Sequence, residues 1–263
     1  MDLGLKGLKA FVGGSSRGLG YAIAYTLAQD GCQVAINGRD QNKLKAASEM
    51  ITKETGTKAV TFAGDAANQE AGPEIIHKAY EALGGLDLMV TNTGGPPSGR
   101  FEVFDEETWQ GAIDLAFMSH VRLIKTALHY LKKSNQASVL TVTSYSVKQP
   151  IPNLVLSNSI RSATIGLTKS LALELGSDGI RFNSILPGWT KTERVIEIME
   201  FRANQNKSSI EEEVNKITQE SPLGRMAEPE EIGRAAAFLL SPAASYITGA
   251  MLSVDGGMVK GTM

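Results

Sequence analysis

The sequence is poor in the residues that build metal clusters and disulfide frameworks. Among its 263 residues there is one cysteine, Cys32, and there are three histidines, His77, His120 and His129, which share no ligand spacing. A single cysteine excludes an intramolecular disulfide and a cysteine-rich zinc site, and it is typical of proteins kept in a reducing compartment. We therefore predict no metal site and a cytoplasmic location.

A strong charge of one sign and a long apolar run are absent as well. The chain has 26 Lys and Arg against 28 Asp and Glu, a formal net charge of −2, whereas non-specific nucleic-acid binding depends on a positive field. Nothing approaches the roughly 18 uninterrupted apolar residues of a membrane span, and residues 1–11 lack the apolar core of a secretory signal. We expect neither a nucleic acid nor a membrane as a partner.

Short β-rich apolar runs alternate with helix-length segments along the whole chain. The predicted strands are residues 9–13, 33–37, 58–63, 86–91, 138–143, 180–186 and 251–254. This alternation predicts right-handed βαβ units and a mostly parallel sheet with helices on both faces. Because no linker divides the chain, we predict one Rossmann-type, doubly wound α/β domain over residues 1–263 with a seven-stranded sheet.

Residues 195–219 depart from this pattern, because they are long, polar and helix-prone. They could form a solvated helical excursion, a mobile cover over a site at the strand ends, or both.

A glycine-rich segment, GGSSRGLG at 13–20, follows the first predicted strand and opens the first helix. Glycines at 14, 18 and 20 permit a tight turn in which backbone amides approach a pyrophosphate at the helix N-terminus. The loop therefore predicts a dinucleotide site. Its candidate binding residues are Gly14, Ser16, Arg17, Gly18, Leu19 and Gly20.

The same stretch also fits G-x-S-x-G, the nucleophile elbow of serine hydrolases, with Ser16 as the nucleophile. A hydrolase would need a downstream histidine, and all three histidines fall in predicted helices. We therefore disfavour this alternative.

Two arginines indicate which dinucleotide is bound. The second strand ends in Asn37, Gly38 and Arg39, without the carboxylate that would accept from the 2′-hydroxyl of an unphosphorylated adenosine ribose. Arg39 and Arg17 could instead clamp a 2′-phosphate, through contacts worth about 1.5–3 kcal/mol each. The sequence thus predicts NADP(H), although both arginines could also be solvated surface residues.

From residue 8 to residue 258 the chain resembles the short-chain dehydrogenase/reductase family, and within it the beta-ketoacyl-acyl-carrier-protein reductase branch. The family landmarks occur in order. They are the loop at 13–20, Asp65, the TNTG segment at 91–94, Ser144, LALEL at 171–175, Pro187 and Gly188 with Thr192, ITG at 247–249 and DGG at 255–257.

The resemblance implies how the rest of the cofactor is held. Asp65 and Ala66 would approach the adenine, and Asn92, Thr93 and Gly94 would lie near the ribose. The nicotinamide end would be held by Pro187, Gly188, Thr190 and Thr192.

The family's catalytic pattern is only partly present. The family uses Asn, Ser, a Tyr thirteen residues after the Ser, and a Lys four residues after the Tyr. Counting from Ser144, those last two positions hold Ser157 and Arg161, and Ala116 stands where the family has Asn. A serine hydroxyl is a weak acid and an arginine does not shuttle protons. Arg161 could instead donate a hydrogen bond to the nicotinamide ribose or stabilise an alkoxide, while Ser144 and Ser157 orient a carbonyl.

A substitute proton donor could be Tyr145, which directly follows Ser144, provided that the loop at 146–153 folds back. Otherwise Tyr145 is a packed aromatic residue at the strand end.

These observations leave two functions open. The first is an NADP(H)-dependent oxidoreductase acting on a small-molecule carbonyl or alcohol, such as a 3-oxoacyl thioester, with a non-standard proton donor. The second is a catalytically degenerate NADP(H)-binding protein that serves as a redox sensor or oligomer partner. The apolar helical segments 167–175 and 233–240 either pack against the sheet or pair between copies, and the second use favours a homo-oligomer, a dimer or a tetramer.

Overall fold

Parallel strands form the centre of the molecule. In the computed structural model, which describes residues 2–262, seven strands run in the order β3-β2-β1-β4-β5-β6-β7, and each neighbouring pair is parallel. The strands are β1 (Lys9–Val12), β2 (Gln33–Gly38), β3 (Ala59–Ala63), β4 (Leu88–Thr91), β5 (Ser138–Val142), β6 (Arg181–Pro187) and β7 (Met251–Val254). Every side chain of β4 and β5 is buried, as expected for strands covered on both faces.

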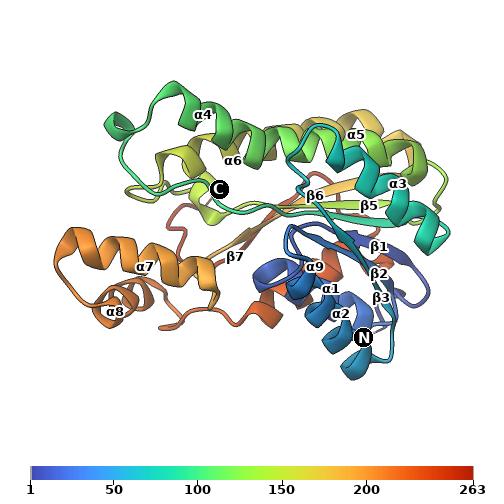
Figure 1. The fold of residues 1–263 in the computed structure, drawn as a ribbon, viewed down its shortest axis with the longest axis horizontal. Helices are drawn as coiled ribbons and strands as arrows, with labels where there is room; N and C mark the ends of the chain where they lie inside the picture. The colour runs from blue at the N-terminus through green and yellow to red at the C-terminus, as the bar shows by residue number, and fades with distance from the viewer. Residues whose placement is uncertain (1, 263) are drawn as a thin grey trace.

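Two layers of helices cover the sheet (Figure 1). One layer contains α1 (Gly18–Gln29), α2 (Gln41–Thr55) and α9 (Pro229–Leu240). The other contains α3 (Ala71–Leu83), α4 (Glu106–Ile113), α5 (Ser119–Leu131) and α6 (Val155–Leu175), and a π-helical turn at Asp114–Met118 joins α4 to α5. Each layer has its own apolar core, with Ile23, Leu44 and Ile232 in the first and Ile76, Leu123 and Ala172 in the second.

The predicted fold is confirmed, with strand ends that agree to within one or two residues. One apolar side of segment 233–240 packs inside the chain. There Ala236, Ala237 and Leu239 are buried in the same core as α1. Within the described residues, no helix combines the length and the apolar character that a membrane span requires.

The polar segment at 195–219 forms a helical pair outside the two layers (Figure 1). α7 (Glu193–Asn206) and α8 (Ile210–Glu220) pack against each other at one end of the sheet. The buried carboxylate of Glu213 on α8 accepts hydrogen bonds from Asn206 and Ser208, which tie α8 to the end of α7, and from Lys216 within α8. These donors lower the pKa of Glu213 to about 2.

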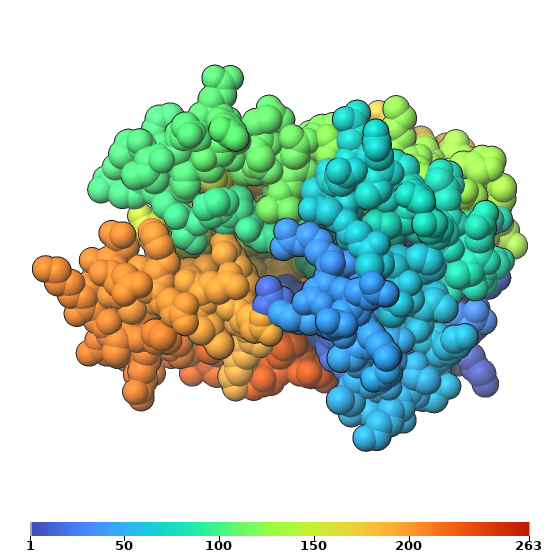
Figure 2. Space-filling view, viewed as in Figure 1, coloured from blue at the N-terminus to red at the C-terminus, as the bar shows by residue number. Residues whose placement is uncertain are grey.

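The order of the strands determines where a ligand can bind. β1 lies between β2 and β4, so the connections from its two neighbours leave toward opposite sides and open a crevice at the carboxyl ends of the strands. Figure 2 shows the surface hollowed between α7, the segment around α4 and the first loops of the chain.

Candidate active site

Hydrogen bonds to the neighbouring strands hold the glycine-rich loop that joins β1 to α1. The Ser15 hydroxyl donates to Val12 O (2.6 Å) and the Ser15 amide donates to Asn37 O (2.7 Å), which ties the loop to β1 and β2. From β4, Asn92 Nδ2 donates to Gly14 O (3.1 Å). Across the described chain no side chain caps the start of α1, so its first amides are free. Free amides at a helix N-terminus are a ready site for phosphate groups.

Two glycines allow this loop to pack tightly on α1. Gly14 has φ +55°, a conformation that favours glycine. A Cβ on Gly20 would lie 2.3 Å from Gly14 O and 2.9 Å from Asn92 Nδ2. Gly20 therefore lies behind the loop and supports it, and it does not line the cleft as a contact residue.

A cleft of about 510 Å³ runs along the carboxyl ends of the strands, and every predicted site residue except Gly20 lines it. The cofactor candidates in it are Gly14, Ser16, Arg17, Gly18, Leu19, Arg39, Asp65, Ala66, Asn92, Thr93, Gly94, Pro187, Gly188, Thr190 and Thr192. The catalytic candidates in it are Ser144, Tyr145, Ser157 and Arg161. The fold therefore brings residues from across the chain into one continuous site.

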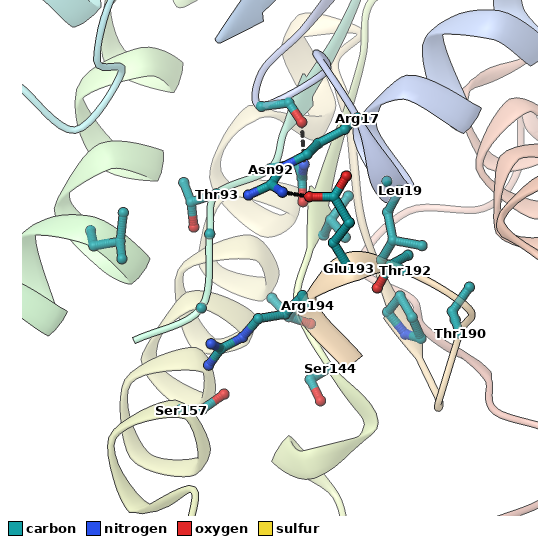
Figure 3. A pocket seen from close by; sticks show the side chains of 18 of the residues that line it. Arg17, Leu19, Asn92, Thr93, Ser144, Ser157, Thr190, Thr192, Glu193 and Arg194 are labelled. Atoms are coloured by element: carbon teal, nitrogen blue, oxygen red, sulfur yellow. Dashed lines mark hydrogen bonds and ion pairs between the residues drawn. The ribbon is translucent and has the colours of Figure 1, made fainter. Parts of the chain in front are cut away.

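Arginines flank one end of the cleft. Arg39 is exposed at the end of β2. Asn37, just before it, is buried and donates to the carbonyls of Phe62 and Gly64, so its amide is committed to the sheet. Arg17 forms an ion pair with Glu193 at the start of α7 (Figure 3). A phosphate that binds Arg17 would therefore compete with that carboxylate.

Ser144 and Ser157 lie at the other end of the cleft (Figure 3). Ser144 lies two residues beyond β5 and caps the short 3-10 turn at Tyr145–Val147, where its Oγ accepts from the amide of Ser146 (3.1 Å). Ser157 lies in the first turn of α6. The two side chains thus come from separate elements and line one cleft.

Arg161, one helical turn beyond Ser157, is almost completely buried. Its Nη1 donates to Val142 O (3.2 Å) and Thr143 O (3.4 Å), and its Nη2 donates to Gly94 O (3.4 Å). Burial, together with the nearby charge of Arg194, lowers the pKa of Arg161 to about 10. Backbone carbonyls therefore fix a cation beneath the end of the cleft that Ser144 and Ser157 line.

Tyr145 lies in the 3-10 turn at Tyr145–Val147 and is only 5% exposed. Its ring packs edge-on against Trp189 at a centroid distance of 6.2 Å. Burial raises the pKa of the phenol to about 12. Tyr145 is thus a packed aromatic residue that also lines the cleft, and it is a weaker acid than an exposed tyrosine.

Ala116 and His120 lie behind this region. Ala116 is in the π-helical turn, and its carbonyl accepts from Thr164 Oγ1 (2.8 Å). His120 is completely buried, with Nδ1 2.7 Å from Thr91 Oγ1, and burial beside Arg161 lowers its pKa to about 3. His120 is therefore neutral and packed between helix and strand.

The serine-hydrolase alternative gains no support from the cleft. Ser16 lines it, but none of the three histidines, all of which lie in the part of the chain that the structure describes, is among the lining residues. Without a histidine nearby Ser16 has no general base.

Sequence reasoning missed the first two residues of α7. Glu193 and Arg194 both line the cleft, and Arg194 Nη2 donates to Pro96 O (2.7 Å) on the loop after β4. The only signal in the sequence was that these residues directly follow Thr192. Their partners, Arg17 and Pro96, are remote along the chain, so local patterns did not reveal them.

A doubly wound parallel sheet with an amide-lined loop at its switch point defines a dinucleotide-binding protein of the Rossmann type. Comparisons with known proteins agree. The family model described as enoyl-(acyl carrier protein) reductase matches residues 14–259. The chain belongs to the short-chain dehydrogenase/reductase family, so the predicted family is confirmed.

Individual relatives match over nearly the whole chain. The chain is 34% identical to glucose 1-dehydrogenase 2 of Bacillus subtilis, over 97% of this chain and 95% of that protein. It is 30% identical to the 3-oxoacyl-[acyl-carrier-protein] reductase FabG of Chlamydia muridarum, over 95% of this chain and 96% of that protein. Among solved structures, L-sorbose reductase from Gluconobacter frateurii, complexed with NADPH and L-sorbose, superposes with a TM-score of 0.94 at 29% identity, over 99% of this chain and 100% of the other.

Proposed function

We propose that this protein is an NADP(H)-dependent oxidoreductase that interconverts a carbonyl and an alcohol, with Ser144, Ser157 and Arg161 at the reacting end. The observation that carries the proposal is the continuity of the cleft. The amide-lined loop at one end and two hydroxyls beside a buried guanidinium at the other line the same space. Its family membership makes the protein a short-chain oxidoreductase.

The residues of the cleft fit a phosphorylated dinucleotide. The uncapped first turn of α1 and the close approach of Gly14 to Gly20 leave a cradle of amides for the pyrophosphate. Arg39 and Arg17 would bind the 2′-phosphate, and the NADPH in the related sorbose reductase supports this choice of cofactor. When bound, the cofactor supplies the hydride for the carbonyl carbon.

Residues of the chain must stabilise the negative charge that develops on the carbonyl oxygen during hydride transfer. Ser144 and Ser157 would donate hydrogen bonds to the carbonyl oxygen, and the Arg161 guanidinium would stabilise the negative charge that develops there. The alkoxide then needs a proton. Tyr145 is the candidate donor that lines the same cleft, and even with a pKa of about 12 it is a stronger acid than an alcohol.

A 3-oxoacyl thioester, the class of compound in the name of the Chlamydia relative, is one carbonyl substrate that the proposal covers. The alternative function, a dinucleotide-binding protein without reductase chemistry, gains no support from the comparisons, because the relatives bear the names of reductases and dehydrogenases.

The helical pair α7 and α8 is proposed as a cover over the cleft, because the first turns of α7 line it. We also propose a homo-oligomer in the cytoplasm. Leu173, which is 77% exposed, lies in the apolar segment 167–175 on which the oligomer prediction depends. Cys32 is a buried thiol, which suits a reducing compartment.

The proposal is tested by titrating NADPH and NADH into the protein and then following NADPH absorbance with a panel of ketones and acyl thioesters. We expect NADPH to bind more tightly than NADH and at least one carbonyl to be reduced. Tight NADPH binding without oxidation on any carbonyl would refute the reductase, and equal affinity for the two dinucleotides would refute the phosphate clamp.

A further inference from the structure

Two guanidinium groups bracket the loop that follows β4. Arg161 reaches it from α6 and donates to Gly94 O (3.4 Å). Arg194 reaches it from the first turn of α7 and donates to Pro96 O (2.7 Å). A Cβ on Gly95 would lie 2.9 Å from Arg194 Nε, so the second guanidinium lies flat against the residue between them. Both arginines line the cleft.

These two positive charges are poorly neutralised by the protein. The hydrogen bonds of Arg161 all go to backbone carbonyls, and within residues 2–262 no carboxylate pairs with it. Arg194 has one acidic partner, Glu197, through a single Nη1 contact of 3.2 Å between partly exposed side chains. Pairs of that kind are weak. The two cations also repel each other, since the charge of Arg194 contributes to the lowered pKa of Arg161.

Unused donors remain on this side of the cleft. A guanidinium has five N–H groups, and the contacts of Arg194 engage only Nη1 and Nη2. Figure 3 shows the Arg194 guanidinium extending across the cleft toward Ser157, on the side of Ser144 and away from Arg17. Free guanidinium donors next to two hydroxyls suit an anion that also carries a carbonyl.

We propose that the substrate is an oxo acid, a carbonyl compound that carries a carboxylate; this inference rests on the proposed reductase function. The carboxylate binds the free donors of Arg194, and Arg161 adds positive charge from the other side of the loop at 94–96. The carbonyl faces Ser144 and Ser157. Arg194 is thus the residue that determines specificity, because a planar guanidinium binds a carboxylate through two parallel hydrogen bonds.

A neutral carbonyl compound would make different use of the two arginines from an oxo acid. A thioester or an unfunctionalised ketone brings no negative charge to Arg194 and leaves the positive charge of the two arginines uncompensated. The phosphates of the cofactor do not fill the same role in this proposal, because the amide loop and Arg17 lie at the other end of the cleft.

The first test compares an oxo acid with its neutral ester. We would measure kcat/KM for 2-oxo-4-phenylbutanoate and for its ethyl ester with NADPH. In Arg194→Gln we expect the preference for the acid over the ester to fall by about 10- to 150-fold, the range expected for charge-assisted hydrogen bonds. Arg194→Lys, which keeps the charge without the planar fork, should lie between. Arg100→Gln is the matched control, because Arg100 is exposed, pairs with Glu102 and lies outside the cleft, so its preference should equal that of the wild type.

The second test needs no turnover. Oxamate, an unreactive analogue of an oxo acid, and ethyl oxamate would be titrated calorimetrically into the enzyme–NADPH complex. We expect oxamate to bind more tightly than its ester, and Arg194→Gln to remove the difference while NADPH affinity and thermal unfolding stay near those of the wild type.

Other results of the two tests would overturn either the inference or the proposed function. If the wild-type complex does not bind oxamate, or if Arg194→Gln binds it equally well, the inference is overturned. A large loss of NADPH affinity in Arg194→Gln would assign the arginine to the cofactor and overturn it too. If NADPH and oxamate bind as expected but no carbonyl is reduced, the proposed function fails and the anion site stands.

Discussion

Replacing Gly20 by alanine tests how the amide loop is built. The added methyl would lie 2.3 Å from Gly14 O, whereas an ordinary contact begins at 3.4 Å. The Gly14 peptide must therefore move by about 1 Å, because its oxygen is backbone and cannot rotate away. A shift of that size lengthens the amide contacts to a bound phosphate beyond hydrogen-bond range.

The size of the effect follows from the bonds that are lost. A hydrogen bond to a charged group contributes about 1.5–3 kcal/mol, so the loss of one such bond should weaken NADPH binding about 10- to 150-fold. The cost to folding is smaller. Overpacking costs about 1–3 kcal/mol, and replacing a helical glycine by alanine returns about 0.8–1 kcal/mol. We therefore expect impaired binding in a folded protein.

Calorimetric titration of NADPH and urea unfolding would measure the two effects separately. Gly166→Ala is the matched control, since Gly166 lies within α6, is exposed, and an added Cβ there would meet nothing within 4 Å. That control should gain up to about 1 kcal/mol of stability and keep the wild-type affinity. Wild-type NADPH affinity in Gly20→Ala would refute the close-packing argument for the loop.

Three further predictions concern single side chains. Arg39→Ala should weaken NADPH binding about 10- to 150-fold and leave NADH binding unchanged in a fluorescence titration; an equal loss for both would contradict a 2′-phosphate contact. Tyr145→Phe should lower kcat by about 10²–10⁴-fold with little change in KM, and unchanged turnover in steady-state assays would remove Tyr145 as the proton donor. His120 has a folded-state pKa of about 3, below its ordinary 6.5, so the unfolded chain binds a proton first as the pH falls. Its contribution to stability is complete above about pH 6.5 and is lost toward pH 3, on the order of 2 kcal/mol between pH 6.5 and 5. Urea unfolding at several pH values should show that the free energy of unfolding falls less with acid in His120→Gln than in the wild type. The same dependence of that free energy on pH in both proteins would contradict the burial argument.

The fold could be predicted well because its signals are local. Apolar runs that end in turn residues mark the strands, and their alternation with helices leaves few topologies for a parallel sheet. The glycine loop at 13–20 was equally predictable, since its glycines follow a strand and open a helix. Each of these features depends on residues that are neighbours in the chain.

The charged partners were not predictable in the same way. Arg17 pairs with Glu193 and Arg194 contacts Pro96 O, and in both cases α7 meets a loop from a distant part of the sequence. Which side chains meet depends on the direction in which α7 leaves β6, and no periodicity encodes that direction. The use of the apolar side of segment 233–240 was open for a related reason, because hydrophobicity does not distinguish a core face from a contact between molecules.

The sequence by itself thus determined the parallel sheet, the amide loop and the set of residues at the strand ends, because the burial pattern and backbone geometry of these features depend on residues close together in the chain. Only the tertiary structure decided how those residues are used. In the folded chain Tyr145 packs against Trp189, and His120 is buried as a neutral side chain. The fold also brings Arg161 and Arg194 to the same loop. Hydrogen-bond partners and acidity depend on neighbours in space, and the chain acquires these neighbours only when it folds.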